Sequence, residues 1–194
     1  MWSISKLVVT AALAFMAPAD TPADTPAKRE ESVIYWSPRT KLIGADFKLP
    51  PESDSHFSAG SHLGTGMEIS GDGERLTFTV QAYFVPEKSW IKVQNADLLA
   101  HEQAHFDLEE YYARLSRREL SRLQVKGRTF DAIRKDADAI LTRMLTDRTQ
   151  AQERFDEETG HSVNVIKEQA WEAHIRQMLE ESKMYAGTEL NFEM

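Results

Sequence analysis

Hydrophobic and polar residues alternate along much of the first half of the chain. Apolar residues occupy every second position of the segment 76–85, which predicts a strand that Pro86 closes. Similar short apolar runs, separated by turn residues, extend from Val33 to about Lys92. We therefore expect the N-terminal part of the folded domain to be rich in β-structure.

The period of the apolar positions becomes helical from Asn95 onward, with spacings of three and four residues. Asn95 or Asp97 can cap a first helix, which ends at a break at 126–127. Two further helices are predicted at about 130–155 and 164–185. These elements predict an α+β fold in which a small β-rich N-terminal part packs on about three long helices.

The N-terminus has the composition of a secretory signal peptide. Lys6 precedes an apolar stretch from Leu7 to Ala17, and small residues follow at a cleavage-like position. The apolar stretch is too short to span a bilayer comfortably, so we expect no stable membrane anchor. The predicted organisation of this periplasmic or secreted protein is a signal peptide at 1–19, a flexible Pro-rich linker at 20–32 and a single domain at 33–194.

The composition is that of one ordinary globular domain. A chain of 194 residues can bury one sizeable core. Its formal net charge of −8 argues against nucleic acid as a partner. Lys and Arg are concentrated between Arg114 and Lys135, which we interpret as a solvated helix face. The sequence has no cysteine, so neither disulfides nor a lipid-modified cysteine is expected.

The segment 101–105, His-Glu-Gln-Ala-His, matches the H-E-x-x-H pattern on the first predicted helix. Residues four apart lie about 6 Å apart along a helix axis, so His101 and His105 can reach one zinc ion while Glu102 activates a water. Both histidines lie on the apolar stripe that begins at Leu98, where an unpaired imidazole is costly to bury. The alternative is a pair of core histidines that backbone or carboxylate partners satisfy.

A catalytic zinc ion usually has three protein ligands, and the sequence offers several candidates for the third. Glu109 lies about 9 Å along the axis from the midpoint of the two histidines, so we interpret it as a surface carboxylate or as a partner of a ligand. His161, in a polar turn between the second and third helices, is the better candidate, although an exposed turn histidine is equally consistent with the pattern. The rivals from later segments are Glu157, Glu158, Glu168 and Glu172.

Three segments of the sequence resemble those of a known protein family. They are 82–90 (Ala-Tyr-Phe-Val-Pro-Glu-Lys-Ser-Trp), 98–107 (with His-Glu-Gln-Ala-His-Phe-Asp) and 155–161 (Phe-Asp-Glu-Glu-Thr-Gly-His). Together they resemble a family of secreted bacterial proteins of unknown function that are described as predicted zinc-dependent proteases. The resemblance implies a zincin-like site on the first helix, with His101, His105 and His161 as ligands and Glu102 as the base. The family commonly has glycine after the last histidine, whereas this chain has Ser162.

We therefore expect an exported zinc-dependent hydrolase, a peptidase that cleaves amide bonds of a protein or peptide substrate with Glu102 as the general base. Two other classes stay open. A metal-binding pseudo-enzyme or envelope interaction protein would keep the ligands without catalysis, and a helical adaptor would not bring them together. Glu102 favours the enzyme, because a purely structural zinc site does not need a carboxylate beside a water.

Overall fold

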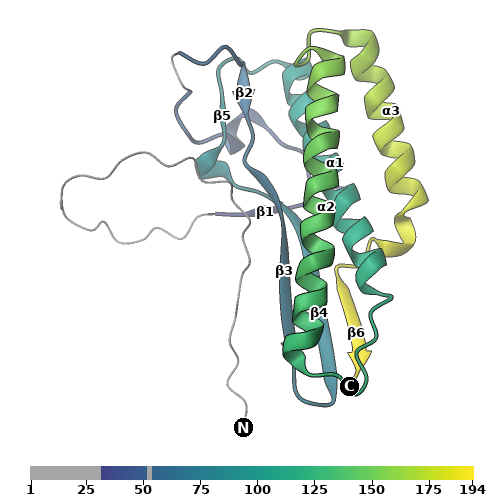
Figure 1. Cartoon of the computed structure of the whole chain (residues 1–194). Helices are drawn as coiled ribbons and strands as arrows, with labels where there is room; N and C mark the ends of the chain where they lie inside the picture. The colour runs from purple at the N-terminus through teal and green to yellow at the C-terminus, as the bar shows by residue number, and fades with distance from the viewer. Residues whose placement is uncertain (1–31, 52–53) are drawn as a thin grey trace, which may run out of the picture.

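The computed structural model describes residues 32–51 and 54–194. The predicted signal peptide, and the predicted linker apart from Ser32, lie outside these residues. The described residues form antiparallel sheets and three α-helices, which confirms the predicted α+β class (Figure 1).

The main sheet is built around one long strand, β4. Its alternate residues, from Leu76 to Phe84, are at most 2% exposed, and this strand confirms the alternation seen in the sequence. Strand β3 pairs along one edge of β4, while β1 and β6 pair with it elsewhere, and β2 pairs separately with β5. The strands are β1 (Ile34–Tyr35), β2 (Ala59–Gly60), β3 (Leu63–Gly71), β4 (Arg75–Phe84), β5 (Trp90–Ile91) and β6 (Glu189–Glu193).

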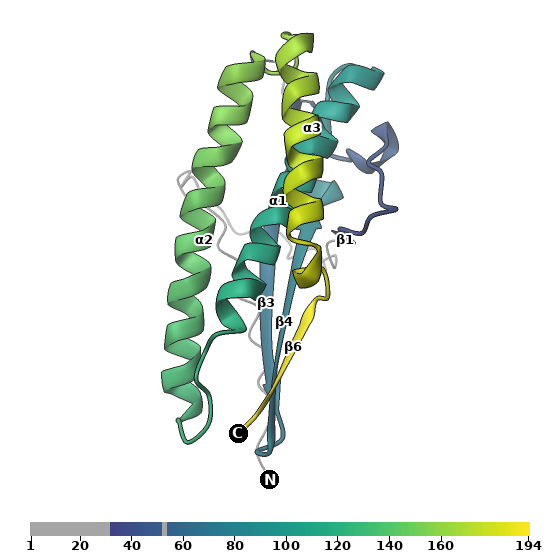
Figure 2. The same cartoon turned by 90° about the vertical axis from the view of Figure 1, so that its right-hand side faces the viewer.

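Helix α1 (Ala96–Leu120) is the central helix and is buried on two sides. It packs on β3 and β4 and also on α2 (Phe130–Thr159) and α3 (Val165–Glu181), as Figures 1 and 2 show. Phe106 joins the sheet core, where its ring lies 6.3 Å from that of Phe84. Leu108 packs instead in a second core between the helices. This double burial explains why polar groups of α1 need partners inside the protein.

The helix ends follow local signals in the sequence. The Asn95 side chain accepts a hydrogen bond from the Leu98 amide at 2.7 Å and caps α1. Thr129 caps α2, and Gly160, with a φ of 60°, ends it. Helix α2 therefore runs about one turn beyond the predicted end at Phe155. The short strand β6 was not predicted, because so brief an alternation after three helices gives little signal.

The predicted solvated basic face is wrong at its beginning. Arg114 and Arg117 are 4% and 0% exposed, because this end of α1 is covered by the sheet and α3. Both donate to Glu110 Oε1, at 2.9 and 2.6 Å. The buried charges are thereby paired within the core.

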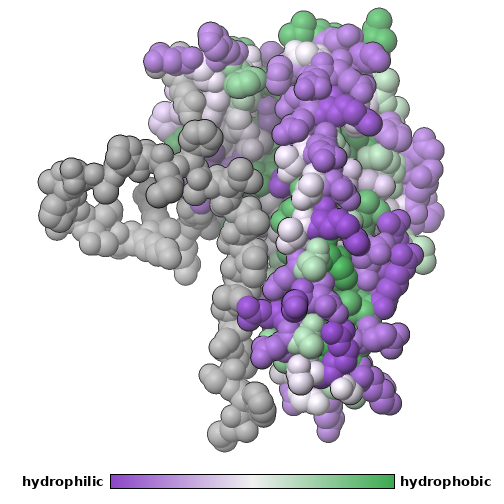
Figure 3. Space-filling model, in the orientation of Figure 1, coloured by the Kyte–Doolittle hydropathy of each residue, from purple (hydrophilic) through white to green (hydrophobic). Residues whose placement is uncertain are grey.

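The surface over α2 is largely hydrophilic, and hydrophobic residues emerge near the turn into α3 (Figure 3). Val163 and Ile166, in and after that turn, are each 81% exposed. No α-helix in 32–51 and 54–194 is long and apolar enough to cross a membrane.

The packing of α1 on the sheet makes a testable prediction. Replacement of Phe106, which is 0% exposed, by alanine should lower the free energy of unfolding by about 3–5 kcal/mol, because it leaves a cavity beside Phe84. The control Ile166→Ala, at a residue that is 81% exposed, should change it by less than about 0.5 kcal/mol. Urea unfolding measures both, and equal effects would contradict the described core.

Candidate metal site

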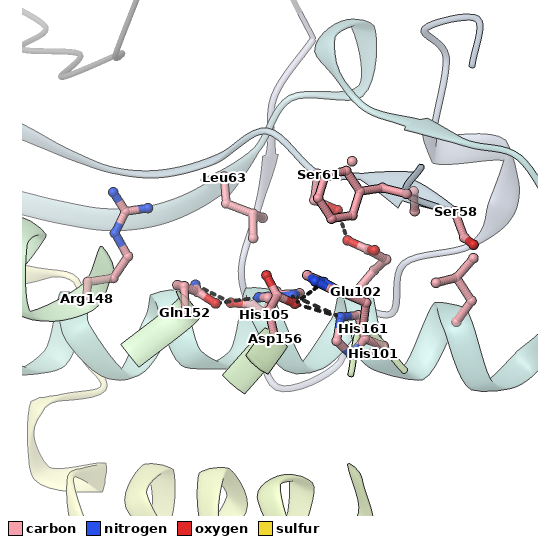
Figure 4. Close-up of a pocket in the computed structure, with 14 residues that line it drawn as sticks. Ser58, Ser61, Leu63, His101, Glu102, His105, Arg148, Gln152, Asp156 and His161 are labelled. Carbon is pink, nitrogen blue, oxygen red and sulfur yellow. Dashed lines mark hydrogen bonds and ion pairs between the residues drawn. The ribbon is translucent and has the colours of Figure 1, made fainter. Parts of the chain in front are cut away.

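Helix α1 brings the two histidines of the sequence motif together. They lie one helical turn apart, and their Nε2 atoms are 3.1 Å from each other (Figure 4). The side chains of His101 and His105 are 4% and 12% exposed. The prediction that both histidines lie on an inward-facing stripe is confirmed.

Helix α2 adds a carboxylate to this pair. Asp156 Oδ1 lies 3.1 Å from His101 Nε2 and 2.9 Å from His105 Nε2. Two imidazole nitrogens and one carboxylate oxygen thus surround a common point, and they form a group that could hold a metal ion.

The other ring nitrogens are fixed by acceptors behind the site. His101 Nδ1 lies 3.1 Å from Glu168 Oε1, on α3. His105 Nδ1 lies 2.5 Å from Gln152 Oε1, while Gln152 Nε2 donates to the backbone carbonyl of His105 at 3.0 Å. Because both acceptors favour a proton on Nδ1, they direct the Nε2 lone pairs of the neutral imidazoles toward the common point.

Phe155 holds the two imidazole rings in place. Its ring stacks on that of His101, with centroids 4.7 Å apart, and meets that of His105 edge-on at 4.8 Å. Phe155 is 0% exposed and also packs against Trp171 of α3. The residue before Asp156 therefore anchors both histidines to the core between the helices.

The pKa values of His101 and Asp156 reflect this crowding. Burial lowers the pKa of His101, but hydrogen bonds with Asp156 and Glu168 outweigh burial and raise the pKa to about 9. Burial raises the pKa of Asp156, whereas hydrogen bonds with His101 and His105 hold it well below its usual range. The three groups favour a positive charge at their centre, which either a proton or a cation can supply.

Glu102 lies in the same pocket and is 5% exposed. Its Oε2 accepts a hydrogen bond from Ser61 Oγ, in the segment that joins β2 to β3 (Figure 4). The pocket has a volume of about 370 Å³ and is bounded by this segment, α1 and α2. The structure thus combines a histidine–aspartate cluster with a neighbouring carboxylate.

His161 lies at the exposed side of the pocket. Its Nδ1 is 3.5 Å from Asp156 Oδ1, its side chain is 52% exposed, and its ring contacts that of Phe57. Its φ is 53° and that of Ser162 is 69°, in the left-handed region that favours glycine. A glycine after His161, as the family resemblance leads us to expect, would adopt this conformation without strain. In the described residues, Asp156 rather than His161 completes the converging group.

Three of the four glutamates that rivalled His161 have other partners. Glu158 accepts from Trp171 Nε1 at 3.0 Å, and Glu172 pairs with Arg176 at 3.4 Å. Glu157 is exposed. Glu168 reaches the site only through Nδ1 of His101, so it can orient this histidine.

The interpretation of Glu109 as a surface carboxylate is wrong. Its side chain is 0% exposed, accepts from Thr65 Oγ1 at 2.7 Å and pairs with Arg148 Nη1 at 2.9 Å. The reason is that α1 is covered by β3 and α2 at this position. Arg148 itself lines the pocket.

Sequence reasoning missed Asp156 and Gln152 as members of the site. Both follow Arg148 at intervals of four residues on α2, and all three line the pocket. The signal was hidden because the predicted helix ended at Phe155, one residue too early to include Asp156. Asp156 is nevertheless the first polar residue of the Asp-Glu-Glu-Thr-Gly-His segment that carries the family resemblance.

Comparison with known proteins gives one family match. The model of a family described as "Bacterial protein of unknown function (DUF922)" matches residues 84–162. This range begins at the end of β4 and includes His101, Glu102, His105, Asp156 and His161. No curated protein and no solved structure matches the chain.

The buried ion pair beside the pocket makes a second prediction. Glu109→Ala should lower the free energy of unfolding by about 3–5 kcal/mol, because it leaves the largely buried Arg148 without its counter-charge. The control Glu180→Ala removes an ion pair with Lys183 in which both side chains are 70% exposed, and we expect a change of about 0–1 kcal/mol. Equal denaturation midpoints for the two variants would contradict the burial of Glu109.

Proposed function

We propose that this chain is an exported zinc-dependent hydrolase, most specifically a peptidase. The observation that carries the proposal is the convergence of His101 Nε2, His105 Nε2 and Asp156 Oδ1 within 2.9–3.1 Å of one another. Their Nδ1 partners and the nearby Glu102 support a catalytic rather than a purely structural site.

The donor set fits zinc. Ligands at about 2.0 Å from a tetrahedral ion lie about 3.3 Å from one another, close to the observed separations of 2.9–3.1 Å. Two imidazoles and one carboxylate are a common set at catalytic zinc sites, which keep a fourth position for water. We therefore propose Asp156 as the third ligand, and His161 as a neighbouring side chain at the exposed side of the site.

Zinc, when bound, supplies Lewis-acid polarisation of a carbonyl and lowers the pKa of a water. Glu102 is the group that removes a proton from the attacking water and returns it to the leaving amine. The hydrogen bond from Ser61 restrains the Glu102 carboxylate beside the pocket. Glu168 and Gln152 keep the two histidines in the tautomer that a cation requires.

The choice of peptide bonds as substrate rests on the H-E-x-x-H chemistry and on the family resemblance. Export rests on the signal-like sequence at 1–19.

The ligand set makes a third prediction. Asp156→Asn should weaken zinc binding more than about 100-fold, because loss of a direct ligand should exceed the effect of losing a ligand's hydrogen-bond partner. His161→Asn should weaken it less than about 10-fold, and Asp147→Asn, at an exposed residue of the same helix, should have no effect. Competition with a chelating dye measures the affinities.

Two results would change this ligand assignment. If Asp156→Asn binds zinc normally while His161→Asn does not, His161 is the third ligand. If the wild-type protein binds no zinc at micromolar concentration, the metal proposal fails.

The role of Glu102 makes a fourth prediction. Glu102→Gln should keep zinc but lose about 10²–10⁴-fold in the rate of peptide hydrolysis, because the amide cannot accept the proton. Glu157→Gln, at an exposed carboxylate, is the matched control and should cleave like wild type. Zinc content and cleavage of a quenched fluorescent peptide library are measured on the same samples. Zinc binding without hydrolysis by the wild-type protein would favour the pseudo-enzyme.

A further inference from the structure

Arg148 differs from the other residues of the pocket because its side chain is always positively charged. Among the described residues that line the pocket, it is the one Arg or Lys, and its side chain is 19% exposed. Figure 4 shows it at one end of a row that continues through Gln152 and His105 toward Glu102. One guanidinium is thus held beside a site whose other titratable groups are carboxylates and histidines.

The guanidinium of Arg148 is held by one carboxylate and has further N–H donors. Nη1 donates to Glu109 Oε2, and Glu109 is itself anchored by Thr65 of β3. Within the described residues, the buried Nε has no hydrogen-bond partner, so a second anion is met by the terminal N–H groups that Glu109 leaves free. A guanidinium carries five N–H donors, so one carboxylate contact leaves donors for a second. Partial burial also strengthens the attraction for an anion that enters the pocket.

The distance from Arg148 to the proposed metal site corresponds to a few residues of an extended peptide. Arg148 and Asp156 are eight residues apart on α2, which corresponds to about 12 Å along the helix axis. An extended peptide advances about 3.3 Å per residue, so it covers this distance in about three to four residues.

We propose that Arg148 is a specificity-determining residue that binds a carboxylate of the substrate, about three to four residues from the cleaved bond. The carboxylate is either an Asp or Glu side chain or the C-terminal carboxylate of the peptide. This inference rests on the proposed peptidase function. Glu109 acts as the positioning residue, since it fixes the guanidinium and neutralises part of its charge.

The test compares acidic and neutral peptides within each enzyme variant. In the first set of quenched fluorescent peptides, one Glu is moved stepwise through a neutral sequence, and each peptide has a matched control with Gln at the same position. The second set compares a free with an amidated C-terminus. Wild type should prefer the acidic member of one position about 10- to 100-fold in kcat/KM. A preference for Glu at one position identifies a side-chain carboxylate. A preference that is lost on amidation identifies the C-terminal carboxylate.

Three variants separate recognition from stability. The double variant Arg148→Gln/Glu109→Gln removes both charges together, so no buried charge is left unpaired, and its Glu/Gln ratio should fall to about 1. Glu109→Gln alone should keep or raise the ratio, because it frees Arg148 from its counter-charge. Arg154→Gln, at a 63% exposed arginine of the same helix outside the pocket, should leave the ratio unchanged.

The outcomes also separate this inference from the proposed function. If wild type cleaves the Glu and Gln peptides equally at every position, and the free and amidated peptides equally, Arg148 does not determine specificity. The peptidase proposal is unaffected by this result. An unchanged preference in the double variant overturns the inference as well. Binding of the same peptides to zinc-loaded Glu102→Gln is measured by fluorescence anisotropy. An Arg148-dependent preference there, without cleavage by wild type, supports anion recognition and rejects the peptidase.

Discussion

The contact of α2 with α1 that brings Asp156 Oδ1 to both imidazole nitrogens is the constraint on which the site depends. Three atoms that carry lone pairs lie within 2.9–3.1 Å of one another, an arrangement that is unfavourable unless a positive charge lies among them. The chain stabilises this arrangement from outside, through the ring of Phe155 and the acceptors on Nδ1 of each histidine. Packing, rather than any single bond, therefore sets the geometry in which a cation can bind.

The carboxylates around the pocket differ because their partners differ. Asp156 faces two imidazoles, and Glu168 lies behind one of them. Glu102 is held by Ser61, whereas Glu109 is paired with Arg148. One kind of group, the carboxylate, thus provides a ligand candidate, an orienting group, a candidate proton acceptor and a counter-charge. The burial of α1 on two sides explains why so many carboxylates lie around the pocket, since each polar group of this helix that faces the core needs a partner.

The sequence predicted the parts of the protein that local patterns determine. Alternation identified β4, and Asn95, one of the two predicted caps, is the residue that caps α1. The H-E-x-x-H spacing placed two histidines correctly because a helix fixes their separation. Asp156 and the ion pair of Glu109 with Arg148 depend on how α2 lies against α1, a tertiary contact with no local signal. The burial of Arg117 was missed for the same reason.

The most direct test of the central claim is a crystal structure of the zinc-soaked protein, with anomalous diffraction measured on both sides of the zinc absorption edge. The account predicts one strong anomalous peak about 2.0–2.2 Å from His101 Nε2, His105 Nε2 and an oxygen of Asp156. Glu102 should lie beside the remaining open position. A structure at saturating zinc with no peak between these three atoms would contradict the account.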